Sequence, residues 1–91
     1  MKSEPDKLLE RHQQLVHSQL RKVNSHVQRA SGEWIINTLM TEGCEVPFRY
    51  KRKRMYRSLA GALVNLTYYP ATDAVAGIEV EIMNVVRIRR A

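Results

Sequence analysis

The 91-residue chain has a single cysteine, Cys44, so no disulfide can form within one molecule. No apolar run is long enough to span a bilayer. The acidic residues Glu4, Asp6 and Glu10 make the N-terminus unlike a signal peptide. These absences predict a cytoplasmic protein without a membrane partner.

The sequence also lacks the residue patterns of common catalytic, nucleotide-binding and metal sites. It contains no GxGxxG, GxxxxGK[ST] or HExxH motif, and no pair of carboxylates in an acid/base context. His12, His17 and His26 do not have the i, i+4 spacing with which two histidines on a helix bind a metal ion. We therefore expect a protein that is not an enzyme and that has no cofactor and no bound metal.

The first third of the chain has the apolar spacing of an amphipathic helix. Its apolar residues recur in a pattern typical of a coiled-coil seam. The seam residues are Leu9, Val16, Leu20, Val23 and Val27. Ser3 and Asp6 resemble a capping box, and Gly32 is a natural helix stop. The pattern predicts one helix over residues 3–30.

After Gly32 the period changes to that of β-strands. Residues 34–40 are apolar and β-branched, which favours a buried strand that begins at a core anchor, Trp34; a helix here or over residues 53–59 is the alternative. Residues 44–51 alternate cleanly, and residues 63–69 and 80–88 are rich in strand formers. The predicted inward side chains are Cys44, Val46, Phe48 and Tyr50 in the first of these strands and Val80, Ile82, Val86 and Ile88 in the last.

These two patterns predict a single α+β domain. Residues 1–32 would form the amphipathic helix, and residues 33–91 a four- to five-strand antiparallel sheet or a small, partly closed β-barrel. A helix of about 25 residues is roughly 38 Å long, which exceeds such a sheet. Its seam therefore predicts either packing on the sheet or contact with a second copy or another protein.

The strongest functional signal is positive charge: 15 basic residues stand against 9 acidic ones, which gives a net charge of +6. Residues 49–57 contain no acid and carry a dense cluster with aromatic side chains among the cations. The cluster consists of Arg49, Lys51, Arg52, Lys53, Arg54, Tyr56 and Arg57, and a second cluster of Arg87, Arg89 and Arg90 ends the chain. Such a balance favours encounters with polyanions.

Clustered lysines and arginines bind phosphates with release of counterions, and aromatic rings can stack on bases. Because the apolar faces must turn inward, we expect both clusters to point outward and to share one surface if their strands are neighbours. The sequence thus predicts a module that binds RNA or single-stranded DNA. Two alternatives are a protein that dimerises or docks through its helix, and a charged strand edge that only prevents aggregation.

Overall fold

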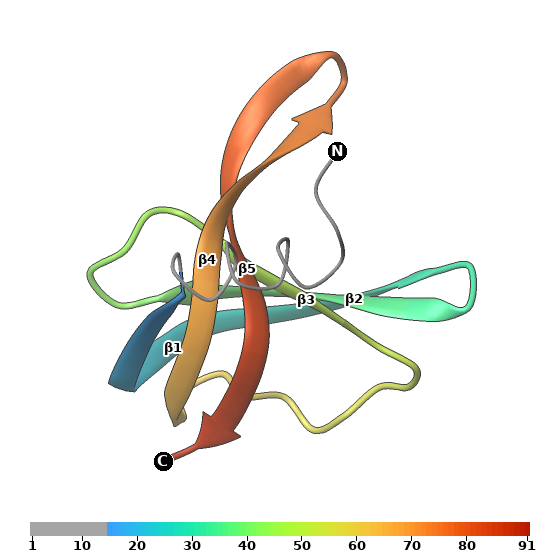
Figure 1. The fold of residues 1–91 in the computed structure, drawn as a ribbon. Helices are drawn as coiled ribbons and strands as arrows, with labels where there is room; N and C mark the ends of the chain where they lie inside the picture. Colours follow the sequence, from blue (N-terminus) through green and yellow to red (C-terminus); the bar gives the residue numbers. More distant parts are fainter. Residues whose placement is uncertain (1–14) are drawn as a thin grey trace, which may run out of the picture.

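The computed structural model describes residues 15–91, and this part of the chain is all-β (Figure 1). Its five strands are β1 (Val16–Ser31), β2 (Trp34–Thr41), β3 (Phe48–Arg52), β4 (Leu63–Val75) and β5 (Ile78–Arg90). The predicted α+β class is wrong, because most of the expected helix is the strand β1. The beginning of that helix, with the seam residue Leu9, lies outside the described residues. No helix in residues 15–91 could cross a membrane.

The strands hydrogen-bond in a closed ring in the order β1–β2–β3–β5–β4, and β4 pairs back onto β1. All neighbours are antiparallel except β3 and β5, whose short parallel ladder joins Phe48 to Met83 and Arg49 to Asn84. The ring therefore has its fewest paired residues between β3 and β5. β4 and β5 continue beyond it as a two-stranded arm, residues 71–82, which projects at the top of Figure 1.

The sequence of β1 explains why it is a strand. Ser18, Asn24 and Ser25 disfavour a helix interior, because their side chains compete for backbone hydrogen bonds. The pairing register shifts twice, between Ser18 and Arg21 and between Val23 and Ser25. Each bulge adds a residue and resets which side chains face inward. Because the two bulges interrupt the two-residue alternation of the strand, the apolar residues of β1 fall at a spacing that resembles a heptad repeat.

The predicted seam is not a common face. Val23 is fully buried, whereas Val16, Leu20 and Val27 are 41%, 65% and 50% exposed. At the first bulge Leu20 has a φ of 55°, which costs a leucine about 1–2 kcal/mol. Its N–H donates to Asn65 Oδ1 at 3.0 Å, which stabilises the bulge. The bulges bend β1 so that its first half pairs with β4 and its second half with β2.

The inner faces of the β1–β2–β3 and β1–β4–β5 sheets meet in one small core. It consists of Val23, Leu39, Phe48, Tyr50, Val64, Leu66 and Tyr68. The alternation predicted for residues 44–51 is confirmed only from Phe48 onward, where Phe48 and Tyr50 are buried and Lys51 is exposed; residues 44–47 precede β3 and are not in a strand. The Phe48 and Tyr68 rings meet edge to face with centroids 4.8 Å apart, a pair worth about 0.5–1.5 kcal/mol beyond the burial of its area.

A third bulge changes the inward face of β5. Thr67 pairs with Arg87, and the next β4 residue, Tyr68, pairs with Val85, so Val86 is left over. Val86 was predicted to face inward but is 56% exposed, and Val85 packs against the core instead. The prediction is wrong at Val86 because the bulge inserts an extra residue between Val85 and Ile88, which both pack against the core, and so breaks the two-residue alternation.

The segment between β3 and β4, residues 53–62, is anchored to β1 without forming a helix, so the helical alternative for residues 53–59 is also wrong. The N–H of Leu59 donates to His26 Nδ1 at 2.9 Å. Because Nδ1 accepts this bond, Nε2 of the neutral ring carries the proton and donates to Asn37 Oδ1 at 2.8 Å. The buried Asn37 is thereby satisfied, and Leu59 is held against the core.

Candidate nucleic-acid interface

The predicted binding residues lie in three places. Arg49 and Lys51 are on the outer side of β3; Arg52, Lys53, Arg54, Tyr56 and Arg57 follow at the strand end and in the next segment; Arg87, Arg89 and Arg90 end β5. β3 and β5 are neighbours, as the predicted common surface requires, but their ladder stops at Asn84. Beyond it, Arg87 and Arg89 line a hollow with β1 and β4 and not with β3. The two clusters therefore belong to different surfaces.

The first surface is the outer face of the β1–β2–β3 sheet, which we call the cationic face. It comprises Val27 and Arg29 of β1, Trp34, Ile36 and Thr38 of β2, Arg49 and Lys51 of β3, and Lys53 just after β3. The intervening residues Asn37, Leu39, Phe48 and Tyr50 are buried on the inner side. Because side chains alternate along a strand, the members of the cationic face point outward.

Strand pairing sets these side chains in rows across the sheet. Arg29 pairs with Ile36, and Ile36 pairs with Lys51, so an apolar side chain lies between two cations. Their backbone positions are about 10 Å apart, which is twice the spacing of neighbouring strands. An open hollow of about 410 Å³ extends over this row and the next, and Val27, Arg29, Ile36, Thr38 and Arg49 line it.

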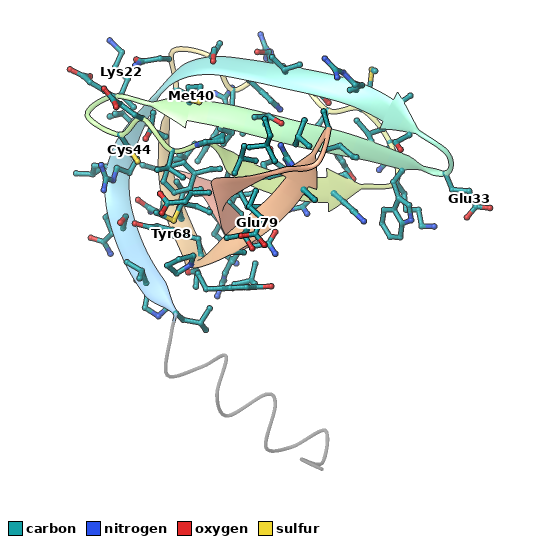
Figure 2. The ribbon with its side chains drawn as sticks, turned by 90° about the horizontal axis from the view of Figure 1, so that it is seen from above. Lys22, Glu33, Met40, Cys44, Tyr68 and Glu79 are labelled. Atoms are coloured by element: carbon teal, nitrogen blue, oxygen red, sulfur yellow. The ribbon has the colours of Figure 1, made fainter. Side chains whose placement is uncertain are left out.

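Trp34 stands at one end of the cationic face. The prediction that it anchors the core is wrong, because its side chain lies on the outer side of β2 and is 40% exposed. Lys53 Nζ lies 4.1 Å from the centroid of its ring, a cation–π contact worth about 0.5–1 kcal/mol at an exposed site. The same ammonium is 3.7 Å from Glu33 Oε2, at the tip of the β1–β2 hairpin (Figure 2). A lysine ammonium and an exposed indole ring thus lie side by side at this end of the cationic face.

Arg49 is partly engaged within the protein. Its Nη1 donates to Asp73 Oδ2 on the β4–β5 arm, and the side chain is 28% exposed. Its Nε is buried without a hydrogen-bond partner among the described residues. The ion pair ties the arm to β3, so Arg49 has less charge to offer a phosphate than the exposed Lys51.

The four tyrosines have different environments. Tyr50 and Tyr68 are 7% and 6% exposed, and Tyr69 is half-buried, so none of these rings offers an open face. Tyr56 is 53% exposed, and Arg54 lies over it with its Cζ 5.4 Å from the ring centroid. The hydrogen bond from Arg54 Nε to the phenol oxygen lowers the pKa of Tyr56, whereas burial raises the pKa of Tyr50. Tyr56 is the tyrosine that can stack on a base.

Gln28 fixes the place of Tyr56 relative to β1. Its side-chain amide donates to the Tyr56 carbonyl at 2.7 Å, and its Oε1 accepts the Tyr56 N–H at 3.1 Å. This pair of bonds holds the backbone of Tyr56 as a strand neighbour would. The exposed ring therefore projects from an anchored position.

Within residues 15–91, no group of three His, Cys, Asp or Glu side chains gathers as a metal site would require. Cys44 is half-buried and packs against the core. No family model, curated protein sequence or solved structure matches the chain. Its function has to be inferred from the geometry of these surfaces.

Proposed function

We propose that the protein is a non-enzymatic module that binds single-stranded nucleic acid, RNA or DNA, across the cationic face. The observation that carries the proposal is the juxtaposition of the Arg29–Ile36–Lys51 row with Trp34 and its cation Lys53. The cations can neutralise phosphates and release counterions. The exposed indole and the apolar side chain between the cations can receive unstacked bases, which a duplex does not present.

The architecture is suited to this activity. The strand order β1–β2–β3–β5–β4, with β3 and β5 parallel, is also the order of strands in the OB fold. In that fold the face of strands 2 and 3 binds oligonucleotides. A shared strand order defines an architecture and no activity, so the side chains of the cationic face carry the proposal.

Both alternatives have less support. A partner docking through a helical seam has no helix to use between Val16 and Ser31, because this stretch is β1. Protection of a strand edge does not account for Arg49, where β3 has a hydrogen-bonded neighbour on each side, although Lys51 and Arg52 lie beyond the short β3–β5 ladder and have a free side. Charges that guard against edge-to-edge pairing are needed on strands with a free side.

The proposal is tested by binding of labelled single-stranded RNA, single-stranded DNA and duplex DNA over a salt series, followed by fluorescence anisotropy. The double variant Arg29→Gln/Lys51→Gln should weaken binding to every single-stranded sequence alike. It should also flatten the salt slope by about 1.4 units, because each phosphate that is no longer neutralised lowers the slope by ~0.7.

The matched control is Lys22→Gln/Arg90→Gln, which removes the same charge from exposed residues outside the cationic face. Its slope should stay much closer to that of the parent. Equal slopes for the two double variants would mean that only net charge matters and that the cationic face is no site. Absence of any single-strand binding by the parent at low salt would reject the function itself.

A further inference from the structure

The β1–β4–β5 sheet carries a second polar hollow on its outer face, with a volume of about 200 Å³. It is lined by His17, Ser18, Gln19, Asn65, Leu66, Thr67, Arg87 and Arg89. Strand pairing places His17, Thr67 and Arg87 in one row and Asn65 beside Arg89 in the next. None of the lining side chains is a phenyl, phenol or indole ring, in contrast to the cationic face.

The hollow offers hydrogen-bond donors. No carboxylate among residues 15–91 lies within ion-pair distance of Arg87 or Arg89, and both side chains are exposed. Asn65 Oδ1 accepts the N–H of Leu20 at 3.0 Å, so its Nδ2 is the atom left to donate outward. His17 Nδ1 is 2.9 Å from Thr67 Oγ1, which fixes the ring beside the arginines. Two guanidinium groups and an amide donor suit the oxygens of a phosphate.

The two hollows face different directions. The inner faces of both sheets contribute to one core, so their outer faces point away from it on different sides. Figure 1 shows β4 and β5 crossing the line of β2 and β3, as expected for two sheets packed at a steep angle. A strand on the cationic face therefore leaves Arg87 and Arg89 uncovered.

We propose that the β1–β4–β5 hollow is a second phosphate-binding site, through which one molecule holds two nucleic-acid strands at once. The inference rests on the proposed function of the cationic face for the first strand. Without a phenol or indole ring, the second site contacts the backbone alone, so it is indifferent to sequence and to whether the second partner is single- or double-stranded.

A capture experiment separates the two sites. A biotinylated single strand is immobilised and loaded with the full-length protein, and after washing a labelled strand that cannot pair with the first is added. The parent should retain the second strand. Arg87→Gln/Arg89→Gln should load equally well on the first strand, yet capture of the second should fall about tenfold or more, because two phosphates are no longer neutralised. Arg21→Gln/Lys22→Gln, which removes the same charge from β1 residues that do not line the hollow, should capture nearly as much as the parent, and thermal unfolding checks that all variants are folded.

Each outcome has a distinct meaning. Undiminished capture by Arg87→Gln/Arg89→Gln, or a parent that loads on the first strand and captures no second, overturns the two-strand proposal and leaves the proposed function intact. A parent that fails to load on the first strand rejects the proposed function and this inference with it. Inorganic phosphate, added as competitor at matched phosphate concentration, should barely release the second strand. If it releases the strand as well as unlabelled oligonucleotide does, the hollow is a site for free phosphate and the proposal fails.

Discussion

The two groups of cations in this protein differ in what surrounds them. On and next to the cationic face, each of several basic side chains already contacts a ring or an acid: Lys53 lies on Trp34, Arg54 on Tyr56, and Arg49 against Asp73. In the β1–β4–β5 hollow, Arg87 and Arg89 have hydroxyl, imidazole and amide neighbours and no phenol or indole ring. Clusters of like charge in the sequence thus correspond to two kinds of surface, one suited to bases and phosphates together and the other to phosphates alone.

The difference arises from where the chain places aromatic residues. Trp34 begins β2 on its outer side, and Tyr56 is exposed with its backbone held by Gln28, whereas Tyr50 and Tyr68 are buried in the core. A cation beside a ring in water contributes little to folding. Such pairs are easily rearranged, so a base can exchange places with Lys53 or stack on the opposite side of the indole.

The largest expected effect comes from breaking the bend of β1 that creates both surfaces. Val23 is fully buried next to the second bulge, and Val23→Asp would place an unpaired charge in the core. Such a change costs upwards of about 4 kcal/mol, which is comparable with the whole stability of a small domain. We expect the variant to be unfolded by circular dichroism and to lack both binding surfaces.

Leu20→Asp is the control, because Leu20 is 65% exposed and aspartate tolerates a positive φ better than leucine does. Its stability should stay within about 1 kcal/mol of the parent. An unfolded Leu20→Asp would contradict the exposed position of Leu20 in β1, and a folded Val23→Asp would contradict the buried position of Val23.

The next largest effect tests whether rings distinguish the two surfaces. Trp34→Ala should weaken binding of a single strand by about 1–3 kcal/mol, which is the stacking contribution of one base. Binding of an abasic phosphodiester chain should change little, since it has no base to stack. Trp34→Phe, which keeps an aromatic face, should recover part of the affinity. Equal reductions for the normal and the abasic chain would show that Trp34 supports the surface and stacks on nothing.

A smaller effect of opposite sign is expected on the β4–β5 arm. Asp73→Asn removes the acidic partner of Arg49 and makes that guanidinium available to a phosphate. Single-strand affinity should rise, and the salt slope should steepen by about 0.7 units. The pair is partly exposed, so unfolding should become easier by no more than about 1 kcal/mol.

Glu81→Gln removes the same charge from an exposed position of the arm and is the matched control. It should steepen the slope less than Asp73→Asn does. If the two variants raise the affinity equally, the increase comes from net charge alone, and Arg49 does not bind a phosphate.

The smallest effect concerns the order in which the tyrosines ionise. The hydrogen bond from Arg54 lowers the pKa of Tyr56, and burial raises the pKa of Tyr50. As the pH is raised, the phenolate of Tyr56 should therefore appear before that of Tyr50, followed by NMR of the ring carbons. Arg54→Gln should move the pKa of Tyr56 upward and leave that of Tyr50 in place. No movement would mean that Arg54 does not contact the ring in solution.

The alternating stretches of the second half were predictable from sequence. Residues 34–40, 63–69 and 80–88 lie in β2, β4 and β5, and the inward and outward sides of β3 follow its pattern. Such stretches reveal themselves because one face of each is buried in the core while the other meets water. The outward direction of Lys51, Arg87 and Arg89 follows from the same rule.

The remaining features depended on bulges and pairing, which have no signature in a single sequence. The bulges near Leu20 and Asn24 give β1 an apolar spacing like that of a helix. The predicted binding residues therefore do not include Val27 and Arg29. Trp34 could be placed only once Asn37 was known to be a buried residue satisfied by His26, which sets the phase of β2. The low helix propensity of the serines and the asparagine in β1 is the feature of the sequence that argues against a helix.

The most direct test of the central claim uses the single tryptophan of the chain, Trp34, as its own reporter. A single-stranded oligonucleotide is titrated into the protein at low salt, and the intrinsic fluorescence of Trp34 is recorded together with the anisotropy of a label on the strand. If bases stack on the cationic face, the tryptophan emission is quenched along the same binding curve, and an abasic chain of equal charge binds with little quenching. A strand that binds by anisotropy while the emission of Trp34 keeps its intensity and wavelength would contradict the account.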